Sequence, residues 1–314
     1  MTANQAITLL MPIKNGERFL IKSIEYLERN AEAEDEILVI DDNSTDKTGS
    51  ILKRWTNRNS KVVVVNNPKS GLVEALNFGL SQASNEWVAR FDADDRYPFS
   101  RISETKKHIN QDAIAIFSDY QFTSSKGIPL GYMPSAIGTD KTYLSLVTSQ
   151  RTAHPSVCFN KYSVLEVGGY QSKDYPAEDL SLWLRMSHIG KLKSIPINLL
   201  KYRLSGASIT GSSRKKALAK KSSLIKNFNF DLDIVRNCIE ELDISKKNYL
   251  NYNHGQERYL LHLRDLAIIL ESQTNRKSSE LDYVKRKISL ELKNYPPALG
   301  LFGQMLLRKI YRLL

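Results

Sequence analysis

Short apolar runs alternate with helical stretches along the first hundred residues. Four runs of four or five residues, apolar nearly throughout, predict strands: Ile7–Met11, Ile37–Ile40, Val62–Val65 and Trp87–Phe91. Strands of this kind are covered on both faces of a sheet. The stretches between them predict helices: Glu17–Asn30, Asp46–Asn57 and Leu72–Ala83. This alternation predicts an α/β fold with a mainly parallel, doubly wound sheet flanked by helices.

The pattern changes in the last third of the chain. A further strand is expected at Ala113–Asp119, and mixed short elements continue to about Ile209. From Arg214 onward the pattern is helical, and residues 211–314 hold 20 Lys and Arg against 11 Asp and Glu. Since Gly and Ser dominate Gly206–Ser213, we expect a boundary there, between a domain of residues 1–212 and a basic helical C-terminal region of residues 213–314.

Composition excludes several classes of protein. With 41% hydrophobic and 25% charged residues among 314, the chain is neither disordered nor collagen-like. No stretch reaches the ~20 apolar residues of a membrane-spanning helix, and Ala6–Met11 is too short for a secretory leader, so we expect a cytoplasmic protein. Cys158 and Cys238 are far apart, which indicates two buried small residues rather than a disulfide framework or a zinc site.

Polar loops follow three of the predicted strands. They are Pro12–Gly16 after the first, Asp41–Asn43 after the second and Asp92–Asp95 after the fourth. In doubly wound sheets, ligands bind outside the carboxyl ends of the strands. The three loops therefore predict one site along one edge of the sheet.

The aspartates of the Asp92–Asp95 turn are hard oxygen ligands of the kind that Mn²⁺ or Mg²⁺ prefers. An ion there would hold a diphosphate. The other interpretation is a turn that caps a helix near Ser100–Asn110. An EF-hand is excluded, because Tyr97 stands where that loop needs Gly. Arg90 either counters the negative charge of such a diphosphate ligand or pairs with the aspartates.

Two further acidic segments carry candidate chemistry. In Asp41–Asp46, Asp41 offers an acceptor for the imide N–H of a uracil ring, whereas Ser44 and Asp46 suit the cap of the next helix. Glu178 and Asp179 begin an amphipathic helix, where backbone N–H groups stabilise a carboxylate. Two interpretations stay open for this pair: a general base acting on an acceptor hydroxyl, or plain helix-start acids.

Two other side chains also have two interpretations each. His154 is either part of an acceptor pocket or a structural hydrogen-bonding group. Trp183 is either a core residue or an aromatic surface on which a sugar stacks.

Seven segments, taken in order, resemble the family 2 glycosyltransferases with the GT-A fold, a Rossmann-like sheet. They are Pro12, Val39–Asp46, Ala75–Leu80, Ala89–Asp95, His154–Ser156, Glu178–Trp183 and Tyr202–Arg203, and the resemblance covers residues 6–210. The Asp-x-Asp motif alone is a weak signal, but seven segments in the family's order are a specific one.

The resemblance implies roles for individual residues. It implies that Asp41 contacts uracil, that Asp92 lies by the ribose and diphosphate, that Asp94 ligates Mn²⁺ or Mg²⁺, and that Asp179 is the catalytic base. Arg90 and Asn77 match family positions near the donor, and Pro12 and Arg203 are further candidates for donor contacts, while His154, Glu178 and Trp183 are the candidates for acceptor contacts. Ser205 stands where the family often has a metal-binding His, so we expect a more open metal site. The Gln-x-x-Arg-Trp motif of processive synthases is missing after Glu178 and Asp179, so we expect single sugar additions.

The expected activity is therefore an inverting, metal-dependent transfer of a sugar from a nucleotide diphosphate donor, with UDP favoured, to an acceptor hydroxyl. The expected acceptor is a saccharide or lipid-linked oligosaccharide of bacterial surface polysaccharide synthesis (O-antigen, capsule or lipopolysaccharide). Arg308, Lys309 and Arg312 share one side of a helix in Leu306–Leu314, which either lies on an anionic membrane at the inner face of the plasma membrane or packs on the catalytic domain. The Ser205–Ser213 stretch is either a lid over the donor or an exposed linker.

Two other classes of protein share part of this pattern. A nucleotidyltransferase also places aspartates and metal on an α/β sheet, but consumes a nucleoside triphosphate. A nucleic-acid-binding protein would explain the net charge of +11 but not the acidic loops, which repel phosphate, so no nucleic-acid partner is expected.

Overall fold

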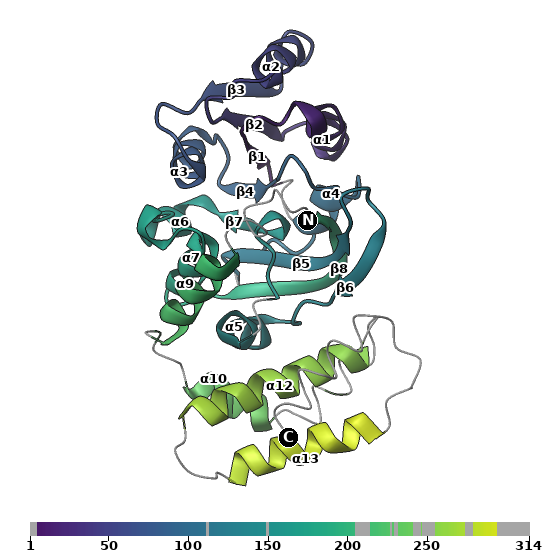
Figure 1. Cartoon of the computed structure of the whole chain (residues 1–314), viewed down its shortest axis with the longest axis vertical. Coiled ribbons are helices and arrows are strands. Elements are labelled where there is room, and N and C mark those ends of the chain that lie inside the picture. Colours follow the sequence, from purple (N-terminus) through teal and green to yellow (C-terminus); the bar gives the residue numbers. More distant parts are fainter. Residues whose placement is uncertain are drawn as a thin grey trace.

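An eight-stranded sheet runs through the first two thirds of the chain, with helices on both of its faces (Figure 1). The computed structural model describes residues 5–110, 113–148, 151–204, 214–226, 228, 232–240, 246, 255–273 and 279–293. The Ser205–Ser213 and Leu306–Leu314 segments lie outside these residues. The lid and the membrane-binding tail therefore stay predictions.

All four strands predicted in the first hundred residues are present, and they pair in parallel in the order β3-β2-β1-β4. Their bounds are Ile7–Ile13 (β1), Glu36–Asp41 (β2), Val62–Asn66 (β3) and Trp87–Arg90 (β4). The second half of the sheet adds Cys158–Asn160 (β7), Ala115–Thr123 (β5), Pro129–Met133 (β6) and Leu192–Arg203 (β8). The β7 strand is antiparallel to β4 and β5, β6 is antiparallel to β5, and β8 is parallel to β5. The predicted α/β fold with a mostly parallel sheet is confirmed.

The helices of the sheet region are Glu17–Asn30 (α1), Thr48–Thr56 (α2), Leu72–Gln82 (α3), Arg101–Lys106 (α4), Thr139–Thr148 (α5), Lys161–Glu166 (α6) and Glu178–Met186 (α7). The helices α1, α2, α3, α4 and α7 lie close to their predicted places, whereas α5 and α6 were not predicted. Two 3₁₀ turns, His154–Ser156 (η1) and Ser172–Asp174 (η2), complete this part. The Asp46 carboxylate accepts hydrogen bonds from the backbone N–H groups of Thr48 and Glu17, so it satisfies the starts of both α2 and α1.

Alternate residues of the central strands face two separate cores, because successive side chains of a strand point to opposite faces. On β1, Leu9 and Met11 pack with α1, α2 and α4, whereas Leu10 packs with α3. The core on the α3 side of the sheet continues through α5 and α7 into the C-terminal helices. Both faces of the sheet are therefore buried, as continuous apolar strands require.

The C-terminal helices Arg214–Lys226 (α9), Leu232–Glu240 (α10), Gly255–Gln273 (α12) and Ser279–Lys293 (α13) lie below the sheet in Figure 1. Two buried ion pairs join α12 to the sheet region: Arg258 with Asp119, and Arg151 Nη2 with Asp265 Oδ2 at 2.6 Å. The described part of the C-terminal region thus shares its hydrophobic core with the sheet region. The domain boundary near residue 212 stays a prediction. None of the described helices combines the length and the apolar character that crossing a membrane requires.

Candidate active site

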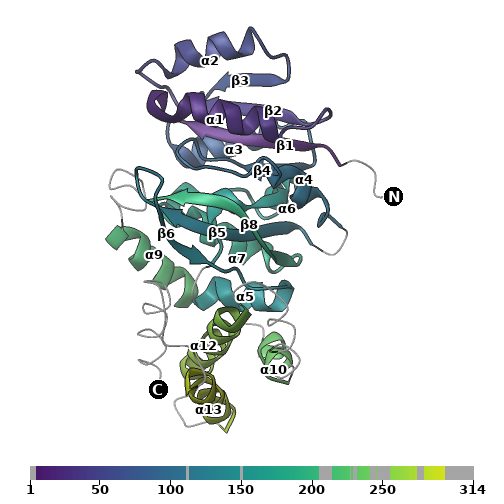
Figure 2. The same ribbon diagram turned by 90° about the vertical axis from the view of Figure 1, so that its right-hand side faces the viewer.

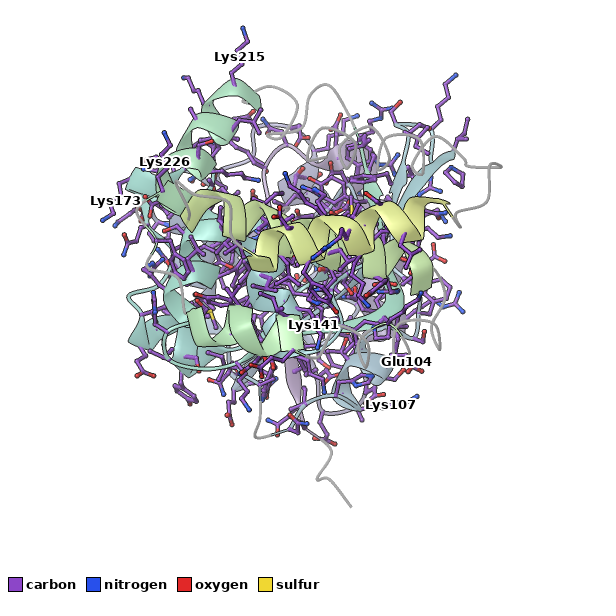
Figure 3. All side chains as sticks on the ribbon, turned by 90° about the horizontal axis from the view of Figure 1, so that it is seen from below. Glu104, Lys107, Lys141, Lys173, Lys215 and Lys226 are labelled. Atoms are coloured by element: carbon purple, nitrogen blue, oxygen red, sulfur yellow. The ribbon has the colours of Figure 1, made fainter. Side chains whose placement is uncertain are left out.

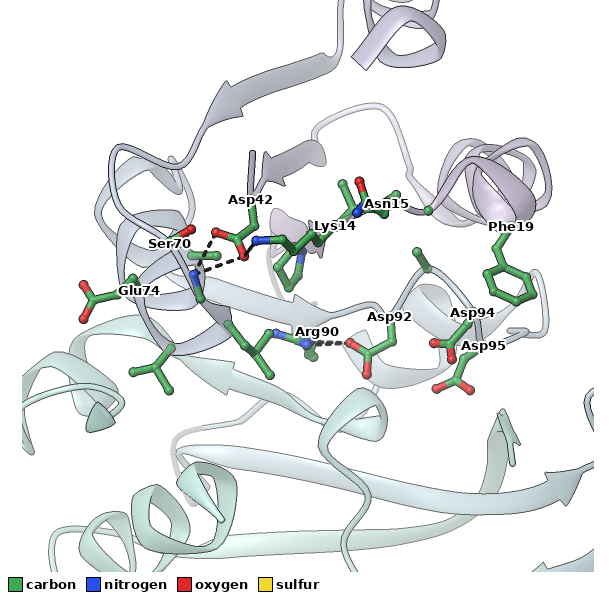
Figure 4. A pocket seen from close by; sticks show the side chains of 18 of the residues that line it. Lys14, Asn15, Phe19, Asp42, Ser70, Glu74, Arg90, Asp92, Asp94 and Asp95 are labelled. Atoms are coloured by element: carbon green, nitrogen blue, oxygen red, sulfur yellow. Dashed lines mark hydrogen bonds and ion pairs between the residues drawn. The ribbon is translucent and has the colours of Figure 1, made fainter. Parts of the chain in front are cut away.

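A pocket of about 760 Å³ opens at the carboxyl ends of β1, β2 and β4 (Figure 4). Its walls come from the three polar loops predicted to meet there, from the start of α3, from Ser172 and Tyr175, and from the end of β8. The expectation that the loops after these strands share one site is confirmed by this geometry. Pro12, Arg90, Asp92, Asp94 and Arg203 all line the pocket.

The acidic turn after β4 (Asp92–Asp95) is supported by a hydrogen bond to Tyr97 and by packed aromatic rings. The Tyr97 hydroxyl accepts a hydrogen bond from the Asp92 backbone N–H at 2.7 Å, and the Tyr97 ring lies 4.4 Å from that of Phe91. The buried guanidinium of Arg101 lies over both rings, at 4.1 Å from Phe91 and 4.6 Å from Tyr97. The turn is therefore rigidly placed before any ligand binds.

The aspartates of this turn do not cap α4, so that alternative is wrong. Asp92 Oδ1 accepts from Arg90 Nε at 2.7 Å, and Asp95 Oδ1 accepts from the Arg203 backbone N–H at 2.7 Å. The N-cap residue of α4 is Ser100, which makes no side-chain cap. Arg90 thus pairs with Asp92, while its Nη1, buried at the pocket wall, has no partner among the described residues.

Asp94 is the turn carboxylate best suited to a metal ion. Burial raises the pKa of Asp94, and the charge of Asp92 raises it further, whereas the charges of Arg203 and Arg90 oppose the rise. These two cations compensate the charge of the carboxylate only in part, and a divalent ion would complete the compensation. No group of three His, Cys, Asp or Glu side chains converges in the described part of the chain. This fits Mn²⁺ or Mg²⁺ held by one or two carboxylates together with phosphate oxygens of a substrate, rather than by an all-protein cage.

At the other end of the pocket the structure places Asp42, not Asp41 (Figure 4). Asp42 accepts hydrogen bonds from Asn67 Nδ2 at 2.7 Å and from the Gly71 backbone N–H at 2.9 Å, and Lys14 Nζ lies 3.3 Å away. Asp41 instead accepts from the backbone N–H of Ser44 at 3.0 Å. The reason is the alternation along β2, which turns Asp41 toward α2 and Asp42 toward the start of α3.

Asn77 is outside the pocket lining, although the resemblance placed it near the donor. Its Nδ2 donates to the Tyr170 carbonyl at 2.8 Å, and its Oδ1 accepts from the Tyr170 N–H at 2.9 Å. Both ends of the amide are therefore used to fasten α3 to the segment before η2. Its contact with the donor has no support in the geometry.

Glu178 and Asp179 stand at the start of α7, outside the lining of the pocket. Burial and the charge of Asp179 raise the pKa of Glu178 to about 7, and Arg90 opposes this rise. Burial raises the pKa of Tyr170 strongly, and the charges of Glu178, Asp179 and Asp92 act on the same hydroxyl. The roles expected for Glu178 and Asp179 in the reaction therefore stay predictions.

The two remaining candidates differ in their surroundings. His154 Nε2 lies 2.8 Å from the Tyr170 hydroxyl, and burial, helped by Arg90, lowers the pKa of His154 well below its usual range. Trp183 is fully buried, with its ring 5.2 Å from that of Phe117 and 6.0 Å from that of Phe159. Trp183 is thus a core residue with no ring face open to a sugar.

Several lining residues were not among the predicted site residues. They are Lys14, Phe19, Asp42, Gly71, Tyr175 and Tyr202. Lys14, Asp42 and Tyr202 lie within segments that the sequence singled out, namely two of the polar loops and the Tyr202–Arg203 pair. The loop before α3 follows β3 at the same edge as the other three loops, and its Gly71 has φ +106°, a conformation that favours glycine. No pattern in the sequence indicates Tyr175.

A sequence model described as glycosyl transferase family 2 matches residues 8–167, about half of the chain. The chain is 27% identical over 197 residues to the UDP-Gal:alpha-D-GlcNAc-diphosphoundecaprenol beta-1,3-galactosyltransferase of Escherichia coli, a match that covers 59% of this chain and 68% of that protein. It is 28% identical over 209 residues to the amylovoran biosynthesis glycosyltransferase AmsE of Erwinia amylovora, covering 62% of this chain and 75% of that protein.

Solved structures show the same fold. S. aureus TarS in complex with UDP-GlcNAc matches with a TM-score of 0.58 and 15% identity, over 84% of this chain and 81% of that chain. The mannosyltransferase PcManGT from Pyrobaculum calidifontis, in complex with GDP-Man and Mn²⁺, also matches with a TM-score of 0.58 and 15% identity, over 99% and 86% of the two chains. These likenesses confirm the predicted GT-A fold.

Proposed function

The chain belongs to glycosyl transferase family 2 and is a glycosyltransferase, and from this premise we propose that it moves a sugar with inversion from UDP to an acceptor hydroxyl. The proposed acceptor is a saccharide or lipid-linked oligosaccharide of bacterial surface polysaccharide synthesis, in keeping with what the names of two relatives state for those proteins. One observation carries the proposal: a single pocket is lined by the loops after β1, β2 and β4, with Asp42 at one end and the acidic turn of Asp92, Asp94 and Asp95 at the other.

The donor would lie along the pocket, with its base near Asp42 and its diphosphate near the acidic turn. Asp42 Oδ1 accepts from Asn67 Nδ2 and from the Gly71 N–H, which also donates to Oδ2 at 3.1 Å, and Lys14 Nζ lies 3.3 Å from Oδ2. Because Asp42 lines the pocket and Asp41 does not, we assign the contact with the uracil imide N–H to Asp42 in place of Asp41. Pro12 lines the pocket beside these residues.

The diphosphate would meet both cations and a metal ion. Asp94, with the free oxygen of Asp92, would hold Mn²⁺ or Mg²⁺, which stabilises negative charge on the departing nucleotide when bound. Arg90 Nη1 and the guanidinium of Arg203, both at the pocket wall, would donate to phosphate oxygens. Arg203 is held for this by its Nε, which donates to the Asp94 carbonyl at 2.5 Å.

Asp179 is the proposed general base. Its Oδ1 accepts from the Leu180 backbone N–H at 2.7 Å, which fixes the carboxylate at the start of α7 and leaves Oδ2 for the acceptor proton. The acceptor oxygen then attacks the anomeric carbon as its bond to the diphosphate breaks, and the configuration inverts. Glu178 and His154 are the proposed acceptor contacts and would orient the attacking sugar.

The test incubates the purified chain with Mn²⁺ and a panel of UDP-GlcNAc, UDP-Gal, UDP-Glc and GDP-Man, with and without membrane lipid extract. We expect UDP to be released, faster with extract, and both Asp94→Ala and Asp179→Asn to lower the rate at least about 100-fold. Glu166→Gln, at an exposed site on α6, is the matched control and should keep the wild-type rate.

Two results would contradict the proposal. One is full activity of Asp179→Asn, which would remove the general base from the mechanism. The other is release of pyrophosphate from a nucleoside triphosphate with no turnover of any sugar nucleotide, which would mark a nucleotidyltransferase.

A further inference from the structure

A second cavity, of about 400 Å³, lies beside the donor pocket. The two share Phe19, Ala93, Asp95 and Arg203 as a common wall. The outer walls of the second cavity come from α1, from Arg96 after the acidic turn, and from the β5–β6 turn at Ser125. It therefore opens next to the proposed position of the diphosphate, and the proposed reaction does not use it.

Four of the residues that line the cavity are cations: Arg18, Lys22, Arg96 and Arg203. The lining holds one carboxylate, Asp95, which is buried and bonded to the Arg203 backbone, and Lys22 Nζ pairs with Glu25 Oε2 at 2.8 Å. Among the described residues, no carboxylate lies within ion-pair distance of Arg18 or Arg96. An arginine fork matches the geometry of a phosphate group, so two unpaired guanidinium groups around one hollow favour a phosphate ligand.

Aromatic packing holds these guanidinium groups in place. The Phe19 ring lies between two of them, 5.3 Å from Arg18 Cζ and 5.1 Å from Arg203 Cζ. The Arg96 guanidinium lies against Gly127, where an added Cβ would come within 2.6 Å of Nη1. The cations are therefore positioned before a ligand arrives.

Large apolar side chains are exposed on the segments that neighbour the lining residues of the cavity. Ile21 on α1 is 64% exposed, Phe99 41%, and Ile128 and Leu130 after Gly127 are 59% and 48% exposed. Phe99 is tied to α1 by its contacts with the Tyr26 ring at 5.9 Å and with Arg29 Cζ at 3.6 Å. Figure 2 shows α1, α4 and β6 on the side of the molecule turned toward the viewer.

We propose that this surface, the α1–hairpin face (Arg18, Ile21, Lys22, Arg96, Phe99, Ile128), docks on an anionic membrane, with a lipid phosphate in the cavity. Exposed apolar side chains among cations are typical of protein surfaces that lie in a membrane interface. The inference deepens the proposed function and rests on it for one point, that the acceptor is lipid-linked. Docking through this face would place the donor pocket at the level of the headgroups, where such an acceptor presents its hydroxyl.

Another basic surface provides a matched control. The α9 helix carries exposed Lys215 and Lys226, which lie far from Glu104 and Lys107 in the view of Figure 3 and do not line the cavity. Of the large apolar side chains in the described part of α9, Leu218 is exposed, whereas four such side chains are exposed on the segments that neighbour the lining residues of the cavity. Lys215→Glu with Lys226→Glu therefore changes the net charge as much as a double reversal on the α1–hairpin face, without touching that face.

The experiment measures co-sedimentation of the full chain with vesicles of pure phosphatidylcholine and of phosphatidylcholine with 30% phosphatidylglycerol, the latter fraction being of the order that makes a membrane strongly anionic. We expect binding to the anionic vesicles only. The Arg18→Glu, Arg96→Glu double variant should bind at least about tenfold more weakly, since each cation near such a surface contributes roughly a fivefold factor. Ile128→Ser should weaken binding about tenfold with the charges intact.

The α9 double variant should lose less than about threefold. Loss of binding in the α9 variant with none in the other two, or equal binding to neutral vesicles, would overturn the proposal. Thermal unfolding checks that each variant folds. If the Arg18→Glu, Arg96→Glu double variant does not fold, the binding of Ile128→Ser to the vesicles tests the proposal. UDP release in vesicle-free buffer is measured on the same samples: its absence in the wild type defeats the proposed function, whereas normal release without vesicle binding defeats only this inference.

Discussion

Replacing Glu178 by Gln should stabilise the protein above neutral pH and change little in mild acid. Glu178 is buried, and its Oε2 has no hydrogen-bond partner among the described residues. Burial and the charge of Asp179 raise the pKa of Glu178 from its ordinary 4.5 to about 7. The folded chain therefore binds this proton more tightly than the unfolded chain does.

The sign and size of the effect follow from linkage. Below pH 4.5 the group is protonated in both states, and as the pH rises from there to about 7 the unfolded chain releases its proton first, so stability falls. At 1.36 kcal/mol for each pKa unit, the folded protein loses roughly 3 kcal/mol by pH 8. Glutamine is neutral at every pH and avoids this cost.

Urea unfolding of the wild type and Glu178→Gln at pH 5 and pH 8 measures the effect. We expect the variant to be more stable by roughly 3 kcal/mol at pH 8 and by less than about 1 kcal/mol at pH 5. Glu166→Gln removes an exposed carboxylate and should change neither value. An equal gain at both pH values would refute the reasoning, because it would not come from the charge.

Three further predictions concern the donor pocket and the C-terminal helices. EDTA should abolish UDP release without shifting the thermal midpoint of the donor-free chain, and added Mn²⁺ should restore release. Asp42→Asn should raise KM for the UDP-sugar about tenfold or more, whereas Asp41→Asn should leave KM within about twofold, as steady-state kinetics would show; the reverse order would return the base contact to Asp41. Arg258→Met should lower the free energy of unfolding by about 3–5 kcal/mol, because it leaves Asp119 buried and unpaired. Lys107→Ala, which breaks the exposed pair with Glu104, should cost less than about 1 kcal/mol in the same urea titration (Figure 3).

Local patterns were enough to predict the sheet half of the fold. The strands β1 to β4 are short and apolar on both faces, and α1 was predicted with its observed bounds. The edge rule then placed the polar loops together, because the carboxyl ends of parallel strands meet at one edge. The core shared by α5, α7 and α12 was not predicted, since it depends on contacts between segments more than a hundred residues apart.

For the site, the sequence identified the segments but not the atoms that face the ligand. Alternation of side chains along β2 decides which of Asp41 and Asp42 faces the pocket, and this alternation is a property of the sequence. The roles of Asn77 and Trp183 were decided by tertiary packing, which uses both ends of the Asn77 amide and covers the Trp183 ring.

The sequence by itself determined the family, the order of the strands and helices in its first hundred residues, and which loops carry acids, because these follow from local periodicity and from motifs of a few residues. Only the tertiary structure decided which carboxylates enter the pocket, that Arg90 pairs with Asp92, and why the pKa of Glu178 is raised. Burial and charge depend on neighbours brought from distant parts of the chain, and no local pattern carries that information.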